Sequence, residues 1–439
     1  MALKKKSKSS TAATAAGSSR PRHSRRMRRD SSSRISSGKP SSGPAKPAPR
    51  PTPAPATQDG APVSPVKGYA DFLSNLEKEH RLRRIPTSDG SGRIDLLSND
   101  YLGLAAEAHL YLPEFHERFP DAAFTSSASR LLSRANRYHL QLEQYLEQLY
   151  GRPALLFNSG YHANVGIIQA LALPGTLFLA DKLVHASIID GLRLSGADFK
   201  RFPHNDPRRL QRLLADLHDS YQRIIVIAEG IYSMDGDMAP LRELADLKSR
   251  YPKMMLYLDE AHSFGVRGQK GLGLAEELGL TDSCDLIIGT LGKAAASAGA
   301  FAITSPVMKD YLLNTTRSFI FSTAISPAQA AWSILMIEKI TQLHDRRLHL
   351  QHLSRHMVSE LSRRLNFESP ATTQIVPLII GDAAEAVLMA AHMAAGGFDA
   401  LAIRRPTVAA GSERIRFSLN ALLSEKDIDR LISLIGRYR

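Results

Sequence analysis

Several features of other protein classes are missing from this chain of 439 residues. It has a single cysteine, Cys284, which excludes an internal disulfide and fits a reducing compartment. No uninterrupted run of about 20 apolar residues occurs, so no membrane-spanning helix is expected. No apolar segment follows the basic start, which argues against a secretory signal peptide. The expected location is therefore cytoplasmic.

Acidic residues are almost absent from the first 66 residues, which hold 14 Lys/Arg and 2 Asp/Glu. The rest of the chain holds 42 Lys/Arg and 41 Asp/Glu, so nearly all of the net charge of +13 belongs to the tail. A nearly neutral folded part argues against nucleic acid as its main partner.

The same tail is rich in Ser, Ala and Pro and has almost no large apolar residues. Such a composition cannot bury enough surface to offset chain entropy, so residues 1–66 are predicted to be disordered. Three roles stay open: a solvated extension, an organelle-targeting peptide, or an arm that binds polyanions.

A complete phosphate-binding loop is also missing. Asp259-Glu-Ala-His262 follows an apolar segment, as in the acidic motif of helicase-type ATPases. Those enzymes need G-x-x-x-x-G-K-[ST] to cradle phosphates. Around Gly292-Lys293, the first glycine position is Ile287 and the residue after the lysine is Ala294, so the ATPase hypothesis is set aside.

Asp259 and Lys293 indicate a different chemistry. A carboxylate can hold a protonated pyridine nitrogen, and a lysine in a Gly-rich turn such as Gly289-Thr-Leu-Gly-Lys293 can form a Schiff base. With His262, they suggest an enzyme that uses pyridoxal 5'-phosphate (PLP) as an electron sink. Neither segment is decisive alone, because most lysines near glycines are merely solvated.

The expected fold class is α/β. Short apolar segments alternate with helical patterns from Ala154–Phe157 to Asp285–Gly289. Such strands are typical of a mostly parallel sheet covered by helices. A helix is predicted over residues 67–85, and a long one runs from Pro327 towards Leu365. Further strands are expected near Gln374–Ile380, Ala400–Ile403 and Arg414–Leu419.

Four regions are expected along the chain. Residues 1–66 form the tail and 67–110 an N-terminal helix and strand segment. Residues 111–330 form the large domain, which binds the cofactor, and residues 331–439 a smaller α+β domain.

Polar residues follow several of the predicted strands, where ligands collect in α/β sheets. They are Asn158-Ser-Gly-Tyr161, His185, and Glu229-Gly-Ile-Tyr-Ser-Met-Asp-Gly-Asp237. Arg416, in the last predicted strand, is suited to a two-pronged pair with a carboxylate. Taken singly, each also fits an interpretation without a functional role: an ordinary turn, a structural histidine, or a surface charge.

Their joint order resembles that of the α-oxoamine synthases, which are fold-type I PLP enzymes. The resemblance covers residues 69–439 and no metal site is implied. The matching segments are Leu97-Ser-Asn-Asp-Tyr-Leu-Gly-Leu104, Ser129-Arg-Leu-Leu-Ser133, Phe157-Asn-Ser-Gly-Tyr161, His185-Ala-Ser187, Glu229–Asp237, Asp259-Glu-Ala-His262, Gly289–Lys293, Phe321-Ser-Thr-Ala324 and Pro406-Thr-Val408.

The resemblance implies a role for each matching residue. Lys293 would bind PLP covalently and later move the Cα proton, and Asp259 would pair with the pyridine nitrogen. His185 would stack on the ring and His262 would contact its phenolic oxygen. The remaining cofactor contacts would come from Gly160, Tyr161, Ser233 and Thr290, and from Ser322 and Thr323 across a homodimer. Substrate contacts would come from Arg83, Asn99, His185, Thr407 and Arg416.

Within that family the chain resembles the branch that serves biotin synthesis. The implied reaction is the decarboxylative condensation of L-alanine with a pimeloyl thioester of coenzyme A or acyl carrier protein. Alternatives are the glycine C-acetyltransferase and serine palmitoyltransferase types, or a non-catalytic partner subunit of the same fold. Retention of Lys293, Asp259, His185 and His262 together argues against the last.

Overall fold

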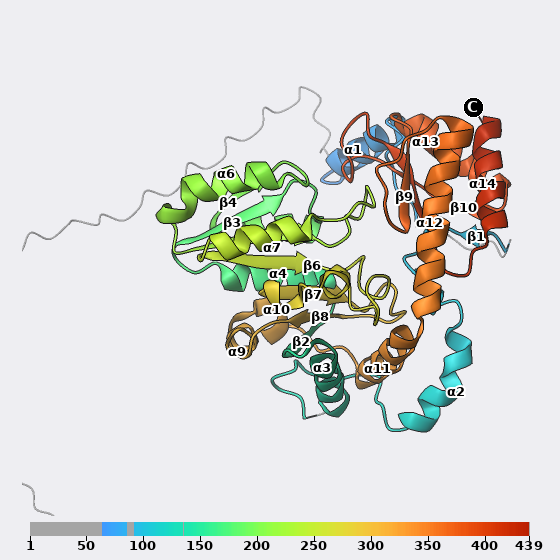
Figure 1. Ribbon diagram of the computed structural model, residues 1–439. Helices are drawn as coiled ribbons and strands as arrows, with labels where there is room; N and C mark the ends of the chain where they lie inside the picture. The colour runs from blue at the N-terminus through green and yellow to red at the C-terminus, as the bar shows by residue number, and fades with distance from the viewer. Residues whose placement is uncertain (1–63, 86–91, 135, 439) are drawn as a thin grey trace, which may run out of the picture. The chain divides into compact units, whose positions relative to one another are not determined.

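The computed structural model describes residues 64–85, 92–134 and 136–438 (Figure 1). Residues 64–439 form one compact unit. The tail predicted to be disordered lies outside the described residues, except for residues 64–66. Among the helices of the described ranges, none has both the length and the apolar character needed to cross a membrane.

A seven-stranded sheet forms the centre of this unit. Its strand order is β2-β8-β7-β6-β5-β3-β4, and the pairs from β7 through β4 are parallel, whereas β8 is antiparallel to both of its neighbours. The strands are β2 (Ala154–Phe157), β3 (Thr176–Asp181), β4 (Asp198–Phe202), β5 (Arg223–Glu229), β6 (Met254–Asp259), β7 (Leu286–Thr290) and β8 (Ala300–Ile303).

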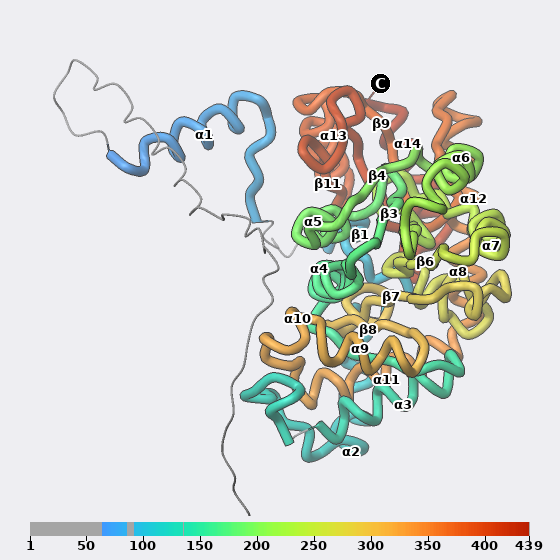
Figure 2. Tube along the Cα trace, turned by 90° about the vertical axis from the view of Figure 1, so that its left-hand side faces the viewer, coloured from blue at the N-terminus to red at the C-terminus, as the bar shows by residue number. Residues whose placement is uncertain are grey.

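The central strands are apolar because helices cover both of their faces. Figure 2 shows α4 (Gly160–Leu171) and α5 (Ala186–Ser195) on one side of the sheet, with α6 (Pro207–Leu217) and α7 (Leu241–Arg250) on the other. Strand residues such as Phe178 and Val226 are fully buried. The mostly parallel, covered sheet predicted from the sequence is therefore confirmed, with β8 as a strand that the prediction omitted.

The C-terminal part contains a small antiparallel sheet in the order β11-β12-β9. Its strands agree with the predicted ones to within about one residue. A two-stranded parallel pair, β1 with β10, joins the N-terminal segment to this part. The strands are β1 (Ile94–Asp95), β9 (Ile375–Ile379), β10 (Phe398–Asp399), β11 (Leu401–Ile403) and β12 (Arg414–Ser418).

The remaining helices complete the layers. Figure 1 shows α12, α13 and α14 close together beside the small sheet. Those not yet given bounds are α1 (Lys67–Lys78), α2 (Ala108–Arg118), α3 (Arg137–Tyr150), α8 (Leu274–Leu278), α9 (Pro306–Thr315), α10 (Arg317–Ile320), α11 (Pro327–Gln342), α12 (His344–Leu365), α13 (Ala383–Ala395) and α14 (Glu425–Tyr438).

Two helix predictions were wrong in extent. The helix predicted over residues 67–85 ends at Lys78, because the chain turns at His80, whose φ is 53°. The long helix from Pro327 towards Leu365 is two helices separated at Leu343. There the buried guanidinium of Arg347 donates to the carbonyl of Ile340 at 2.6 Å, which satisfies the end of α11.

Candidate active site

The carboxyl ends of the parallel strands surround a cavity of about 160 Å³. Strand β5 ends at Glu229 and β6 at Asp259, whereas Lys293 follows β7. The structure brings the four catalytic candidates, which are up to 108 residues apart in sequence, to this one cavity. Its lining residues are Gly160, Tyr161, Asn164, His185, Ser187, Glu229, Asp259, Ala261, His262, Thr290 and Lys293.

Lys293 is the first member of a buried polar chain. Its Nζ lies 2.7 Å from Nε2 of His262, and Nδ1 of His262 lies 2.6 Å from the hydroxyl of Tyr101. Burial lowers the pKa of Lys293 to about 8. Burial and the charge of Lys293 hold the pKa of His262 well below its usual value, so the imidazole is neutral. The lysine amine therefore loses its proton at much lower pH than an exposed lysine.

Asp259 is buried and is held by neutral donors. One carboxylate oxygen accepts from Nδ2 of Asn164 at 2.8 Å, and the other accepts from the backbone N–H of Ala261 at 2.9 Å. Asn164 is itself fixed, because its Oδ1 accepts from the hydroxyl of Tyr257 at 2.7 Å. Among the ion pairs of the described residues, none joins Asp259 to a cation, so a ligand that carries a positive N–H suits this carboxylate.

His185 stands at the start of α5, on the same cavity. Its Nδ1 accepts from the backbone N–H of Ser187 at 3.2 Å, and its own backbone N–H donates to Oε1 of Glu229. Burial lowers the pKa of His185, although the charge of Asp259 opposes that effect. A neutral, fixed imidazole at the cavity wall is suited to lie against a flat aromatic ring.

Glu229 is a carboxyl group that the sequence analysis noted without giving it a role. It is 3% exposed and lines the cavity with Asp259. Burial, and then the charge of Asp259, raise the pKa of Glu229 well above its usual value. A protonated Glu229 adds no second negative charge beside Asp259, while its Oε1 holds the backbone of His185.

Arg416 lies on β12 and extends the polar chain that begins at Lys293. Its Nη2 donates to Oδ1 of Asn99 at 3.1 Å, and Tyr101 donates to the same oxygen at 2.8 Å. Nε of Arg416 donates to the carbonyl of Ser233 at 2.6 Å. The guanidinium is thus buried and fixed in direction beside the cavity, although it does not line it.

The other candidates for cofactor binding divide into two sets. Gly160, Tyr161 and Thr290 line the cavity, and Gly160 begins α4, whose free backbone N–H groups suit a phosphate. The Thr290 hydroxyl donates to the carbonyl of Gly299 at 3.2 Å. Ser233 instead lines a second, larger cavity of about 1090 Å³.

This larger cavity also contains two substrate candidates that are 324 residues apart. Nη2 of Arg83 donates to Oγ1 of Thr407 at 2.9 Å, and both side chains line it. His185 lines both cavities, so the two are neighbours. The lining carries many cations, namely Arg81, Arg83, Lys182, Arg201, Arg405 and Arg414, against one carboxylate, Asp235.

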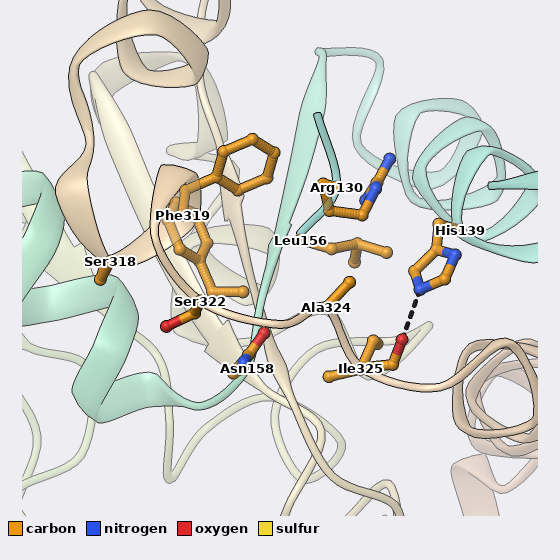
Figure 3. A pocket seen from close by; sticks show the side chains of 10 residues that line it. Arg130, His139, Leu156, Asn158, Ser318, Phe319, Ser322, Ala324 and Ile325 are labelled. Atoms are coloured by element: carbon orange, nitrogen blue, oxygen red, sulfur yellow. Dashed lines mark hydrogen bonds between the residues drawn. The ribbon is translucent and has the colours of Figure 1, made fainter. Parts of the chain in front are cut away.

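Ser322 and Thr323 do not line the cavity that holds Lys293. Figure 3 shows Ser322 beside Asn158, in a separate small pocket that also includes Phe319 and Ile325. Nδ2 of Asn158 donates to the carbonyl of Thr323 at 2.5 Å. Within one chain, these two candidates therefore form no part of the lining of the Lys293 cavity.

The donors of the Lys293 cavity fit PLP. A buried carboxylate faces the cavity without a cationic partner, as a pyridinium nitrogen requires. The amine of Lys293, which forms the covalent link in such enzymes, faces the same space. The start of α4 supplies backbone donors for a phosphate, and a neutral imidazole from His185 supplies a surface for the ring.

The sequence analysis gave no role to three residues of this site. Asn164 holds Asp259, Tyr101 links His262 to Arg416, and Glu229 holds the backbone of His185. Tyr101 and Glu229 lie inside segments that matched the α-oxoamine synthases, which was the available signal. Asn164 carried no such signal, because an Asn within a helical pattern is usually a solvated residue.

Comparison with known proteins agrees with this geometry. The sequence profile of the aminotransferase class I and II family matches residues 91–435. A protein of Glaesserella parasuis, named a putative 8-amino-7-oxononanoate synthase, is 43% identical over 377 residues, which is 84% of this chain and 99% of the relative. The 8-amino-7-oxononanoate synthase of Haemophilus ducreyi is 42% identical over 385 residues, which is 84% of this chain and 99% of the relative.

Solved structures give the same family. Serine palmitoyltransferase from Sphingomonas wittichii superposes with a TM-score of 0.77 at 26% identity, over 86% of this chain and 99% of that one. An 8-amino-7-oxononanoate synthase from Francisella tularensis gives a TM-score of 0.66 at 26% identity, over 79% of this chain and 97% of that one. The chain therefore belongs to the class I and II aminotransferase family of PLP-dependent enzymes, in the group of α-oxoamine synthases.

Proposed function

We propose that this enzyme condenses L-alanine with a pimeloyl thioester, with loss of carbon dioxide, to give 8-amino-7-oxononanoate. One observation carries the proposal. Lys293, Asp259, His185 and His262 line a single cavity that fits PLP, in a chain 41–43% identical to relatives named for this reaction over nearly their whole length. Bound PLP would supply the electron sink that stabilises a carbanion at the alanine Cα.

Lys293 is the proposed general base. Its amine faces the cavity, and burial lowers its pKa to about 8, so a useful fraction is unprotonated near neutral pH. Nε2 of His262 lies 2.7 Å from the amine and holds it in direction. Lys293 would first hold the cofactor, then remove the alanine Cα proton, and finally return a proton to the product carbon.

Asp259 is proposed to keep a proton on the pyridine nitrogen. Its oxygens accept hydrogen bonds from two neutral donors, Nδ2 of Asn164 and the N–H of Ala261, so the positive N–H of the ring is its proposed ionic partner. His185 would lie on the ring face, held by Glu229 through its backbone. Gly160, Tyr161, Ser233 and Thr290 are the remaining candidates for contacts to the cofactor within the same chain.

Arg416 is proposed to bind the alanine carboxylate. It is buried, and its hydrogen bonds to Asn99 and the Ser233 carbonyl fix the direction of its guanidinium. A carboxylate paired with two guanidinium N–H groups is held firmly, which aligns the Cα–H bond for removal. The condensation product must then release that carboxyl group as carbon dioxide.

The acyl thioester is proposed to enter through the larger cavity. Arg83 and Thr407, hydrogen-bonded to each other, lie on its wall and suit the free carboxylate of a dicarboxylic acyl group or the carrier. The excess of cations in this lining over a single acid favours anionic substrates, including both coenzyme A and acyl carrier protein.

A homodimer with shared sites is part of the proposal. Ser322 and Thr323 do not line the Lys293 cavity of their own chain, and they follow Phe321, which is 70% exposed. Residues that match cofactor contacts of the family but do not line the cavity of their own chain favour a site that a second copy completes. In that dimer the two hydroxyl groups would reach the cofactor phosphate of the partner.

The serine palmitoyltransferase type is the second candidate, because solved structures of that enzyme superpose with TM-scores up to 0.77, against 0.66 for the synthase from Francisella tularensis. Steady-state assays with alanine, glycine and serine, each against acetyl, pimeloyl and palmitoyl thioesters, decide between them. We expect alanine with the pimeloyl thioester to give the highest kcat/KM. A tenfold advantage for either other acyl group, about 1.4 kcal/mol of transition-state free energy, would reject the proposal.

A further inference from the structure

His204 lies between two carboxylates at the strand ends. Its Nδ1 is 2.9 Å from Oδ1 of Asp181, the last residue of β3, and its Nε2 is 2.8 Å from Oδ2 of Asp237, in the segment after β5. His204 itself follows β4, and its side chain is 23% exposed. One imidazole therefore links the segments that follow three neighbouring strands.

The imidazole is charged and does not suit a metal ion. Burial opposes the charged form, but the hydrogen bonds to Asp181 and Asp237 outweigh it and raise the pKa of His204 to about 10. His204, Asp235 and Asp237 bring possible ligand atoms within 4.8 Å of one another. However, an imidazolium that donates both N–H groups has no lone pair for a metal, and Asp235 pairs with Arg414.

Neighbouring contacts tighten the same junction. The backbone N–H of Asn205 donates to Oδ2 of Asp181 at 2.8 Å, and Nδ2 of Asn205 donates to Oδ2 of Asp237 at 2.6 Å. The His204 ring packs edge-on against Tyr232, with ring centroids 4.4 Å apart. Two adjacent residues after β4 thus hold both of the other segments.

Both held segments carry groups of the candidate site. Oδ1 of Asp181 also accepts from the backbone N–H of Leu183 at 2.8 Å, which fixes the turn that leads to His185. The other segment contains Ser233, whose carbonyl accepts from Nε of Arg416 at 2.6 Å. His204 therefore does not touch His185 or Arg416 itself but acts on each through one of these two segments.

We propose that His204 is a positioning residue, whose imidazolium holds the His185 turn against the PLP site and the Ser233 segment under Arg416. The proposal rests on the roles given above to His185 and Arg416. The charge is necessary as well as the two hydrogen bonds. Without it, only the neutral donors of Asn205 would join the carboxylates of Asp181 and Asp237, and the repulsion between the two negative charges would weaken the junction.

The test is His204→Gln in the full-length holoenzyme, with His352→Gln as the matched control. His352 also pairs with a carboxylate, Glu425, but lies on α12 with its side chain 51% exposed. For His204→Gln we expect kcat/KM for alanine to fall about 10–100-fold, by analogy with the loss seen when the hydrogen-bond partner of a metal ligand is replaced. The visible circular dichroism of bound PLP should weaken and its dissociation constant should rise, whereas His352→Gln should change neither.

Asp237→Asn is a milder variant that keeps the pair between His204 and Asp181. It should raise KM for alanine through Arg416 but leave the circular dichroism of PLP near that of the parent enzyme. If His204→Gln does not fold, the KM for alanine of Asp237→Asn tests the proposal instead. The proposal would be overturned if the folded variants kept the PLP dichroism, the PLP affinity and the KM for alanine of the parent enzyme. A lower Tm without any of these changes would overturn it too. Because PLP binding needs no thioester, its loss in His204→Gln is measurable even if the parent rejects pimeloyl substrates and the proposed function fails.

Discussion

Nζ of Lys293 lies 2.7 Å from Nε2 of His262, and among the described residues no carboxylate forms an ion pair with either side chain. Burial is the main reason that the pKa values of both groups fall, to about 8 for Lys293. An ammonium ion in such a place is costly, so the amine gives up its proton readily. Burial thus prepares Lys293 for nucleophilic attack and proton transfer, and the contact with His262 fixes the position of its amine.

Lys293 should carry the cofactor. Protein prepared with PLP should show a visible absorption band, and borohydride should fix the label on the peptide that contains Lys293. Lys293→Ala should lose at least about 100-fold in kcat, the lower end of what a general base contributes. Labelling of another lysine would contradict the assignment.

Asp259→Asn should retain PLP but lose most activity, because a neutral amide does not hold a proton on the pyridine nitrogen. The fall in kcat/KM should exceed about tenfold, or 1.4 kcal/mol. Asp198→Asn is a suitable control, since Asp198 lies on edge strand β4, outside the lining of both cavities, and accepts from the hydroxyl of Tyr221 at 2.9 Å. Parental turnover in a folded Asp259→Asn protein would exclude this role.

The charge of His204 should appear in the pH dependence of stability. Hydrogen bonds to Asp181 and Asp237 overcome burial and raise its pKa from 6.5 to about 10. Its stabilising contribution is thus complete below pH 6.5 and is lost as the pH rises through 10. The nearby Asp235–Arg414 pair and Tyr232 are common to parent and variant.

Urea denaturation of apoprotein at pH 6.5 and pH 10 tests this, with His204→Gln beside the parent. The free energy of unfolding should decrease more over this interval in the parent than in the variant. Lys293 produces the opposite trend, because its lowered pKa favours stability at higher pH. Lys293 is present in both proteins, so its effect cancels when the change in the variant is subtracted from the change in the parent. Equal changes would show that His204 is not charged as described.

The basic tail should be dispensable for chemistry. Most of the net charge of +13 lies in residues 1–66, whereas the residues that line the two cavities lie between Arg81 and Arg414. Deletion of residues 1–60 should leave kcat and the oligomeric state unchanged within about twofold. A large loss of turnover in a folded truncation, measured at two ionic strengths, would show that the tail reaches the site.

Much of the large sheet could be predicted from the sequence. Segments such as Ala154–Phe157 and Met254–Asp259 coincide with strands β2 and β6, because short apolar runs between helices are a strong local signal. Strand β8 was not predicted, since no helix separates Ala300–Ile303 from β7, and the alternation of strands and helices that marked the other strands is missing there. The end of α11 was not predicted either, because it depends on the guanidinium of Arg347 from the next helix.

The site could be predicted in part. The order of motifs identified Lys293, Asp259, His185 and His262 as candidates, which the fold brings together. The supporting contacts could not be predicted. Asn164 contacts Asp259 across 95 positions, and His204 contacts Asp237 across 33, so these partners are known only once the strands are ordered.

The last prediction concerns Arg83 and the acyl substrate. Arg83 is exposed, donates to Thr407 at 2.9 Å and lines the larger cavity. The next residue, Arg84, instead forms an ion pair with Glu77, with 3.3 Å between Nη2 and Oε1, and its side chain is 80% exposed. Arg84→Ala is therefore a control that removes the same charge from nearly the same place without touching the cavity wall.

Arg83→Ala should raise KM for the pimeloyl thioester about tenfold, since a hydrogen bond to a charged group is worth about 1.5–3 kcal/mol and this one is partly solvated. KM for alanine should not change, because Arg416 lies on another element. If Arg83 binds the terminal carboxylate, an acyl thioester of similar length without that carboxylate should show no loss in Arg83→Ala. An equal loss with both acyl groups would place Arg83 at the carrier instead, whereas an effect matched by Arg84→Ala would reduce its role to general electrostatic attraction.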